Sequence, residues 1–429
     1  MGSNYKEFTL KKILFIGPEV TDFLNPLAEK LSDLGYSVDL LENRKIPRKN
    51  SDRIKPYNEV IDFQKLVSQK LSFSKVIKYF FKYEFYKKLG VNVFFDLLDG
   101  KSKFFKNIRI VINDLHLKQV FSPLLNKYDV ISLQSISPDL LLFVDYIKRE
   151  KKIILSYWGS DLFQIWGFKT KSSDTIKDHY KSLMAVKKTA KITVISYEME
   201  RALIAKFGSG IQHKIVRTFF STNDPQFHLM DKLKNSDLIE FGQKYKIPEN
   251  KIKITIGYCG DPICNHLLVI DELEHLGIKS KDRVHLLVPM TYGNFSDDYK
   301  KEVINKLNQI KISYTLFDKY LAIEEVVKLR LISDIMVQMS KSDALSSSVC
   351  EAIYAENVLI SAIWLPYSPF RLSDIYFFET DFNNFAQTAD YIINNYELVK
   401  ERVFDNAEKI RELTALDKTL ENWKVVIES

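Results

Sequence analysis

The chain of 429 residues is too long for one ordinary hydrophobic core and suits two or three domains. Its content of 46% hydrophobic and 27% charged residues excludes a largely disordered chain. The three cysteines cannot form a disulfide framework and fit a reducing compartment. Because neither a run of about 18 apolar residues nor an export signal is visible, we expect a cytoplasmic protein.

Positive charge is concentrated in one segment, residues 66–112. Ten Lys and Arg stand there against three Asp and Glu, so this segment accounts for the whole formal net charge of +7. It also contains eleven aromatic residues. Basic and aromatic side chains together suit an anionic membrane surface. A solvated basic face whose aromatics belong to the core explains the pattern equally well, and nucleic acid is the least favoured partner.

Alternating strands and helices are predicted along the first half. An apolar run at 12–16, a helical pattern at 24–34 and a strand at 36–41 form one βαβ unit of a parallel sheet. After the basic segment, further strands are predicted at 129–133, 152–156 and 192–195. A polar stretch, 223–250, is predicted to be the linker, so the first domain spans residues 1–222.

The second half repeats this rhythm. Strands separated by helices are predicted at 252–257, 283–289, 313–317, 334–338 and 358–361. We therefore expect an α/β protein with two Rossmann-like domains that face each other across a cleft. The second domain spans 251–400, and a C-terminal helix at 401–429 is expected to cross back to the first domain. In such sheets ligands bind at the carboxyl ends of the strands, so we expect the binding residues on loops that follow strands.

The first of four such loops, 156–163, follows a strand of the first domain. It contains a glycine close to Asp161, and this pair lets both backbone and carboxylate approach a ligand. An ordinary turn, with Asp161 capping the next segment, explains the same residues.

The second loop, 256–266, follows the first strand of the second domain. Gly257 and Gly260 leave room for an anion, and the N–H groups of a helix that begins near His266 favour phosphate. A plain glycine turn is the alternative. Two cysteines and His266 also have the spacing Cys-x4-Cys-x-His of a partial zinc site, but no fourth ligand lies nearby, so we expect no metal.

The third loop, 288–294, places Tyr292 directly after a strand, where its ring can stack on a ligand; a strand-terminating turn is the alternative. The fourth, 342–351, has Asp343 in the loop and Glu351 within the first turns of a helix. Between these carboxylates lie the hydroxyls and N–H groups of Ser346, Ser347 and Ser348. The segment Ser348-x-x-Glu351 also fits a capping box, which needs no ligand.

In this order and spacing, the four loops resemble those of glycosyltransferases of the two-Rossmann (GT-B) fold. Asp343-x7-Glu351 is similar to the Glu-x7-Glu motif of the large retaining family 4. The segments 158–163, 256–266 and 288–292 resemble loops of the bacterial 4-acetamido-4,6-dideoxygalactose transferases that build enterobacterial common antigen. The resemblance covers about residues 130–365.

This resemblance implies transfer of a sugar from a nucleotide-diphosphate sugar to an acceptor hydroxyl. It implies that Glu351 binds the nucleotide ribose and that Asp343 lies near the donor sugar. The diphosphate is then expected at the loop containing Gly257, Gly260, Asn265 and His266, and at the helix start formed by the three serines. Family 4 usually has an Arg and a Lys where this chain has Asn265 and His266, so backbone amides are expected to contribute more, with Lys319 or Lys341 as the cation.

No Asp-x-Asp motif is present, so we expect chemistry without metal or cofactor. Asp161 is the candidate general base if the reaction inverts configuration, and a positioning group for the acceptor if it retains configuration. The stereochemical outcome stays open between the two families. The basic-aromatic segment suits a glycan or polyprenyl-linked acceptor at the inner surface of the cell membrane.

Two rival functions use the same fold. A nucleotide-sugar epimerase has the same donor site but needs no acceptor and no membrane segment. A non-catalytic scaffold in polysaccharide assembly keeps the fold and loses donor binding. Retention of both Asp161 and Glu351 favours the enzyme.

Overall fold

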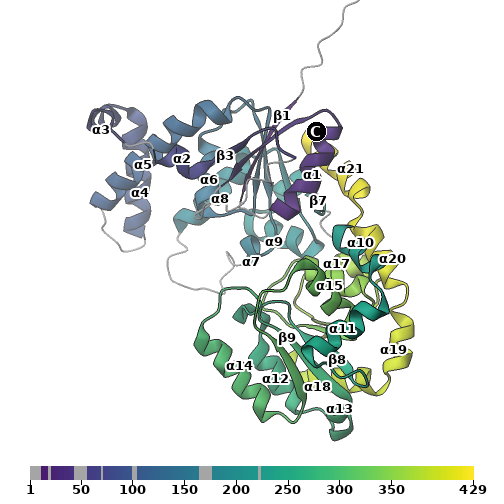
Figure 1. Ribbon diagram of the computed structural model, residues 1–429. Coiled ribbons are helices and arrows are strands. Elements are labelled where there is room, and N and C mark those ends of the chain that lie inside the picture. The colour runs from purple at the N-terminus through teal and green to yellow at the C-terminus, as the bar shows by residue number, and fades with distance from the viewer. Residues whose placement is uncertain are drawn as a thin grey trace, which may run out of the picture. The chain divides into compact units, whose positions relative to one another are not determined.

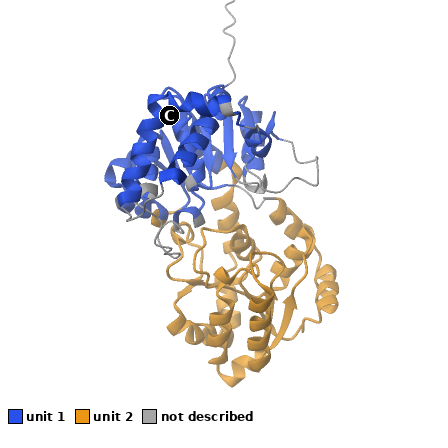
Figure 2. Ribbon diagram, turned by 90° about the vertical axis from the view of Figure 1, so that its left-hand side faces the viewer, with its two compact units in different colours: residues 1–195, 199–220, 419–429 blue, residues 196–198, 221–418 orange. Residues whose placement is uncertain are grey.

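A computed structural model describes residues 11–17, 21–42, 56–68, 71–98, 104–163, 176–220 and 224–429. The chain folds into two compact units (Figure 2). Unit 1 comprises residues 1–195, 199–220 and 419–429, and unit 2 comprises residues 196–198 and 221–418. Both units are α/β, and each is built around its own parallel sheet.

The sheet of unit 1 has seven strands in the order β3-β2-β1-β4-β5-β6-β7. All neighbouring strands are parallel. The strands are β1 (Lys12–Gly17), β2 (Ser37–Glu42), β3 (Val60–Asp62), β4 (Val130–Gln134), β5 (Lys152–Ser156), β6 (Lys191–Val194) and β7 (Ile215–Arg217). The order reverses between β1 and β4, which makes this pair the switch point of a doubly wound sheet.

Helices cover the sheet of unit 1 on both sides (Figure 1). Strands β1 and β4 are therefore buried along nearly their whole length, as their continuous apolar sequences predict. The helices that precede β4 in the chain are α1 (Thr21–Asp33), α2 (Phe63–Val67), α3 (Phe73–Phe80), α4 (Tyr83–Leu98) and α5 (Phe104–Leu125). The later ones are α6 (Pro138–Leu141), α7 (Ser160–Phe163), α8 (Ile176–Lys188) and α9 (Tyr197–Phe207), with the 3-10 helices η2 (Leu142–Asp145) and η3 (Ser209–Lys214).

Helices α3 and α4 and the first half of α5 project from the sheet as a helical lobe, residues 71–98 and 104–115 (Figure 1). The lobe has a small core of its own, formed by Tyr79, Phe85, Val111 and Leu115. Part of the basic-aromatic segment is thus ordinary core. No described helix is long and apolar enough to cross a membrane.

The sheet of unit 2 has six parallel strands in the order β10-β9-β8-β11-β12-β13. They are β8 (Ile252–Ile256), β9 (Val284–Pro289), β10 (Ser313–Phe317), β11 (Ile335–Gln338), β12 (Val358–Ala362) and β13 (Phe378–Thr380). This is again the Rossmann order, with its switch point between β8 and β11. The loops after these two strands diverge there. The candidate donor residues lie on them or at the start of the helices that follow, except Tyr292, which lies on the loop after β9.

Helices of unit 2 enclose its sheet and form one large core with it. Those before and between the strands are α10 (Asp224–Lys232), α11 (Asn235–Tyr245), η4 (Pro262–Cys264), α12 (His266–Glu274), α13 (Ile278–Arg283), α14 (Asp297–Gln309), α15 (Ile323–Ile332), α16 (Ser347–Tyr354) and α17 (Ser368–Leu372). The stretch predicted to be the linker, 223–250, contains α10 and α11. Phe227 and Met230 of α10 are buried in the core of unit 2.

The C-terminal part of the chain forms four helices, α18 (Phe382–Asn394), α19 (Tyr396–Arg402), α20 (Asn406–Thr414) and α21 (Leu416–Glu428). The first three pack in unit 2, whereas residues 419–429 belong to unit 1. There Trp423 is buried among side chains of β1 and α1, and its indole N–H donates to the Phe219 carbonyl at 3.0 Å. The chain therefore passes between the two units around residues 195–199, at 220–221 and again at 418–419.

Candidate functional site

Three loops at the carboxyl edge of the unit 2 sheet are tied together by hydrogen bonds. The Gly260 N–H donates to the Tyr292 carbonyl at 2.7 Å, which joins the loop after β8 to the loop after β9. The Asn265 side-chain amide donates to the Met339 carbonyl at 2.7 Å, which joins the loop after β8 to the loop after β11. The Lys341 N–H adds a second bond of this kind, to Ile263 at 2.9 Å. Residues far apart in sequence therefore form one rigid surface.

Glycine is required at two points of the loop after β8. Gly257 has a φ of +65°, and a Cβ there would lie 3.0 Å from Cβ of Cys264. A Cβ on Gly260 would overlap the ring of Phe295. At these two positions the backbone packs directly against the side chains of Cys264 and Phe295, which leaves no room for a Cβ atom.

His266 begins helix α12 and is completely buried. Its Nδ1 lies 3.2 Å from the Tyr299 hydroxyl, while its Nε2 has no well-formed hydrogen bond within the described residues and faces Gly257. Burial lowers the pKa of the imidazole to about 4, so the ring is neutral near pH 7. His266 thus supplies no positive charge for a diphosphate. The first-turn N–H groups of α12 and the cationic Lys341 on the neighbouring loop are the better candidates for that charge.

The two cysteines of this loop are both buried, and their Sγ atoms lie 3.6 Å apart. Across the part of the chain that the structure describes, no three His, Cys, Asp or Glu side chains are grouped so that they hold a metal ion. Cys259 and Cys264 therefore pack as small apolar side chains inside the loop.

Asp343 is a buried carboxylate on the loop after β11. One oxygen accepts a hydrogen bond from the Tyr367 hydroxyl at 2.7 Å and another from the Ser346 N–H at 3.1 Å. The Tyr258 hydroxyl lies 3.5 Å from the other oxygen. Burial raises the pKa of Asp343, opposed by these bonds. The Asp343 carboxylate thus fixes the start of α16 through its bond to the Ser346 N–H.

Glu351 lies in the second turn of α16 and is 5% exposed. Among the described residues, the only polar partner of its carboxylate is Arg330 of α15, which is 3% exposed and has its Nε 3.4 Å from Glu351 Oε2. Burial raises the pKa of Glu351, while the Arg330 charge lowers it. The Nη1 of Arg330 is buried without a hydrogen bond in the described chain. This ion pair is therefore incompletely satisfied, and it has donor capacity left for a ligand.

The alternative capping box at Ser348-x-x-Glu351 does not form. The N-cap of α16 is Ser346, two residues earlier, and the Glu351 carboxylate turns to Arg330 instead. Ser347 is the first residue of the helix. The three serines thus surround the helix start, where N–H groups point out of the helix.

Tyr292 is 54% exposed and lies beside Ser348. Burial raises the pKa of its hydroxyl to about 12, whereas the Ser348 hydroxyl and the Arg330 charge lower it. Tyr292, Ser348, Arg330 and Glu351 therefore meet in one place, although they come from three separate stretches of the sequence. An exposed ring close to a buried ion pair suits a flat, polar ligand such as a nucleoside.

Asp161 belongs to unit 1 and follows β5. Its carboxylate accepts hydrogen bonds from the N–H groups of Ile136 at 2.7 Å, Trp158 at 3.0 Å, Gly159 at 2.8 Å and Leu162 at 2.9 Å. Burial raises its pKa to about 6, against the effect of these bonds. The side chain therefore joins the loop after β5 to the loop after β4.

Sequence reasoning did not identify Arg330, Tyr258 or Tyr367 as parts of this site. Tyr258 and Tyr367 carry no motif, and Arg330 sits in a helix whose other residues are ordinary. Only the packing of α15 against α16 reveals Arg330. The one available signal in the sequence was the position of Arg330 among apolar residues of a helix, since an arginine there needs a partner when it is buried.

Comparison with known proteins identifies the fold. No family model and no curated protein matches this chain. Among solved structures, a glycosyltransferase from Rickettsia africae is similar, with a TM-score of 0.64 and 16% identity over 98% of this chain and 100% of that one. Anabaena Alr3699/HepE, solved with UDP and glucose, has a TM-score of 0.65 and 12% identity over 97% and 98% of the two chains. WaaG, a glycosyltransferase involved in lipopolysaccharide biosynthesis, has a TM-score of 0.60 and 11% identity over 97% and 100%.

The chain therefore has the GT-B fold, and the expected pair of Rossmann-like α/β units is confirmed. At these identities the likeness establishes the fold alone. Among proteins of this fold, the chain is similar over nearly its full length to glycosyltransferases.

Proposed function

We propose that this protein is a glycosyltransferase that moves a sugar from a nucleotide-diphosphate sugar to an acceptor hydroxyl. The observation that carries the proposal is the meeting of the loops after β8, β9 and β11 at the switch point of the unit 2 sheet. Ligands bind at this position in sheets of this topology. The solved complexes of HepE with UDP and with UDP-glucose support the same class of donor.

The nucleoside is assigned to the corner formed by Tyr292, Ser348 and the Arg330–Glu351 pair. Glu351 oxygens accept hydrogen bonds from ribose hydroxyls, and the unpaired Nη1 of Arg330 has a donor to spare. The diphosphate is assigned to the first turns of α12 and α16, whose N–H groups stabilise negative charge. Charge that develops on the departing diphosphate is stabilised by the same groups.

Asp161 keeps its two proposed roles, general base or positioning group. Four backbone N–H groups already donate to its buried carboxylate, so its oxygens are engaged within unit 1. This geometry favours a positioning role for the loop on the acceptor side. A reaction that retains configuration, as in the Glu-x7-Glu family, fits that role.

The acceptor is proposed to be a lipid-linked or other cell-surface glycan precursor at the inner face of the membrane. The likeness to the 4-acetamido-4,6-dideoxygalactose transferases and the basic-aromatic segment 66–112 support this part. A metal-independent hexosyl transfer without a further cofactor is proposed because two helix starts and Lys341 provide for the diphosphate charge.

Calorimetric titration of the full chain with UDP, GDP, TDP and the matching nucleotide sugars, with and without EDTA, tests the donor site. We expect one nucleotide to bind with an affinity that EDTA leaves unchanged. Absence of binding across the panel would overturn the proposal in favour of the scaffold. Incubation with the bound nucleotide sugar alone then separates the two enzymes, because an epimerase converts the sugar without an acceptor whereas a transferase does not.

A further inference from the structure

Helix α4 of the helical lobe carries apolar side chains on the face that points to solvent. Residues 83, 86, 87, 90, 91, 94 and 97 recur at the spacing of one helical face, and all are exposed. The large ones are Tyr83 (82% exposed), Tyr86 (58%), Val91 (39%), Phe94 (58%) and Leu97 (66%). We call this face the α4 stripe.

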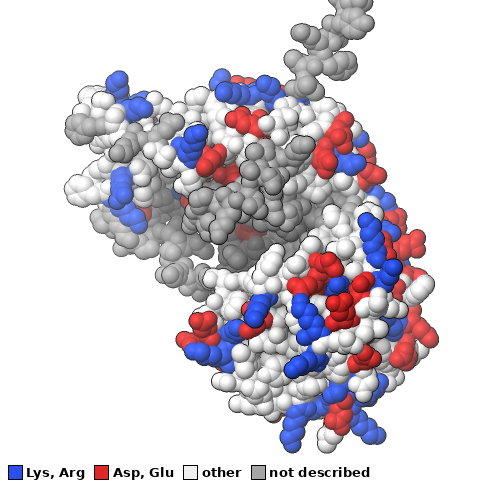
Figure 3. All heavy atoms as spheres, viewed as in Figure 1, with Lys and Arg blue, Asp and Glu red and all other residues white. Residues whose placement is uncertain are grey.

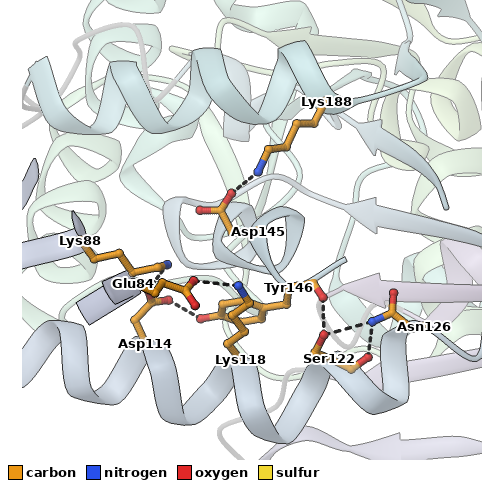
Figure 4. Close-up of polar contacts among 9 residues, drawn as sticks. All are labelled: Glu84, Lys88, Asp114, Lys118, Ser122, Asn126, Asp145, Tyr146 and Lys188. Atoms are coloured by element: carbon orange, nitrogen blue, oxygen red, sulfur yellow. Dashed lines mark hydrogen bonds and ion pairs between the residues drawn. The ribbon is translucent and has the colours of Figure 1, made fainter. Parts of the chain in front are cut away.

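Three of the four charged residues of α4 turn towards α5, whereas Lys87 lies within the stripe. Glu84 bonds to Lys118 at 2.7 Å, and Lys88 pairs with Asp114, both partners being on α5 (Figure 4). The Tyr146 hydroxyl donates to the same Asp114 at 2.6 Å. Helix α4 thus directs most of its charged side chains towards α5 and a row of apolar side chains towards solvent, whereas a helix that faces water usually does the reverse.

Neighbouring parts of the lobe extend the apolar surface. Phe81 between α3 and α4 is 84% exposed, and Phe104 and Phe105 at the start of α5 are 51% and 85% exposed. Single exposed apolar residues are common on protein surfaces. Eleven large ones on one small lobe, the eight named above together with Ile77, Phe80 and Ile110, are not, and such a concentration marks an interaction site.

The lobe also carries unpaired positive charge. Six exposed basic side chains make no ion pair within the described chain: Lys75, Lys78, Lys82, Lys87, Lys106 and Arg109. The described acids of the lobe are engaged, Glu84 and Asp114 as above and Asp96 with the Asn107 amide at 2.7 Å. In Figure 3 the described surface of the lobe is mostly white, with separate blue patches.

We propose that the α4 stripe docks this protein onto an anionic lipid bilayer. Aromatic rings suit the headgroup level of a membrane, and each nearby lysine is attracted by anionic lipid. A second copy of the chain would bring two positive surfaces together in a two-fold contact, which charge repulsion disfavours. Nucleic acid offers no counterpart for the aliphatic Val91 and Leu97.

The inference deepens the proposed function by naming the surface on which a lipid-linked acceptor is met. Only the biological role of the docking rests on the proposed function. The docking itself does not, because the α4 stripe lies in unit 1 and the donor site in unit 2. Vesicle binding is measured without a nucleotide sugar. Either proposal can therefore fail while the other stands.

Cosedimentation of the full chain with vesicles tests the proposal, using phosphatidylcholine alone or with part of it replaced by phosphatidylglycerol. We expect the wild type to bind only the anionic vesicles. Phe94→Ser with Leu97→Ser is expected to weaken binding about tenfold or more. Gln at Lys75, Lys78, Lys82 and Lys87 is expected to weaken it on the order of a hundredfold. The matched control is Phe404→Ser, which removes a 70% exposed ring from unit 2 and should change nothing.

A site-specific readout accompanies this assay. Phe94→Trp should shift its fluorescence to the blue when anionic vesicles are added, and Phe404→Trp should not. The proposal is overturned if the wild type ignores anionic vesicles or if the Phe94→Ser, Leu97→Ser variant binds them as well as the wild type. A dimer that this variant converts to monomer would instead identify a second copy as the occupant, and tighter binding of a single-stranded oligonucleotide that displaces the vesicles would identify nucleic acid.

Discussion

Glu351 and Arg330 form a buried ion pair that the proposed ligand would share. Glu351→Ala leaves Arg330 charged and unpaired inside the protein, so we expect the free energy of unfolding to fall by about 3–5 kcal/mol. Nucleotide affinity should fall as well. Urea denaturation and calorimetric titration measure the two effects separately.

A double variant separates ligand binding from stability. Arg330→Met with Glu351→Leu replaces the pair by apolar side chains of similar size, an exchange that often leaves stability unchanged. We expect this variant to be folded and still unable to bind nucleotide. Normal nucleotide affinity in the stable double variant would show that the pair is purely structural.

Asp161 provides a second residue-scale prediction. Asn at this position offers one acceptor oxygen where the carboxylate now serves four N–H groups, so Asp161→Asn should lower the stability of unit 1 by about 3 kcal/mol. Donor affinity in unit 2 should not change. A variant with the wild-type urea midpoint and no turnover would instead assign Asp161 to the chemical step.

Buried His266 makes the stability of unit 2 depend on pH. Its pKa is lowered to about 4 in the folded protein, against 6.5 for the free side chain, so below pH 6.5 the unfolded state binds the proton more readily. Its stabilising contribution is complete above pH 6.5 and is lost as the pH falls towards 4, by about 3 kcal/mol in total. His285, whose pKa burial also lowers to about 4, adds to the same trend. Urea denaturation at pH 7, 6 and 5 should show a shallower loss for His266→Gln than for the wild type, and equal slopes would contradict the assignment.

At the scale of elements, the loop after β8 depends on the absence of a side chain at Gly260. Gly260→Ala forces the Phe295 ring to move, and we expect a loss of about 1–3 kcal/mol together with weaker nucleotide binding. Phe295→Leu in the same chain should restore part of both. Gly90→Ala is the control, because nothing lies near its added Cβ and helix α4 should gain up to about 1 kcal/mol. Wild-type stability and affinity in Gly260→Ala would show that the loop adapts without strain.

Elements of the fold differ in how well sequence predicts them. The central strands β1, β4, β8 and β11 are short segments rich in large apolar residues, and they were predicted to within one or two residues. The edge strands β3, β7 and β13 were missed, since three residues are too few to show a period. Helices α10 and α11 were missed because their composition is mostly polar. Each buries only one side, which requires only a few apolar residues.

At the scale of the whole molecule, α21 closes the hydrophobic core of unit 1 with residues from the far end of the chain. Trp423→Ala removes a buried ring and its bond to Phe219, so we expect unit 1 to lose about 3–5 kcal/mol. Hydrogen exchange followed by mass spectrometry should show faster exchange in β1 and α1 and no change in β8 or α12. Equal protection everywhere would mean that α21 is dispensable for unit 1.

Sequence alone determined the fold class and the four loops that follow strands, because strand and helix periods and the position of a loop after a strand are local properties. Tertiary structure decided what those loops do. Asp343 and Asp161 proved to be bonded to backbone, and Glu351 to Arg330, since a hydrogen-bond partner from another element has no signature along the chain. The same holds for the α4 stripe: its aromatics are visible in the sequence, but whether they are covered depends on which neighbours pack against the helix.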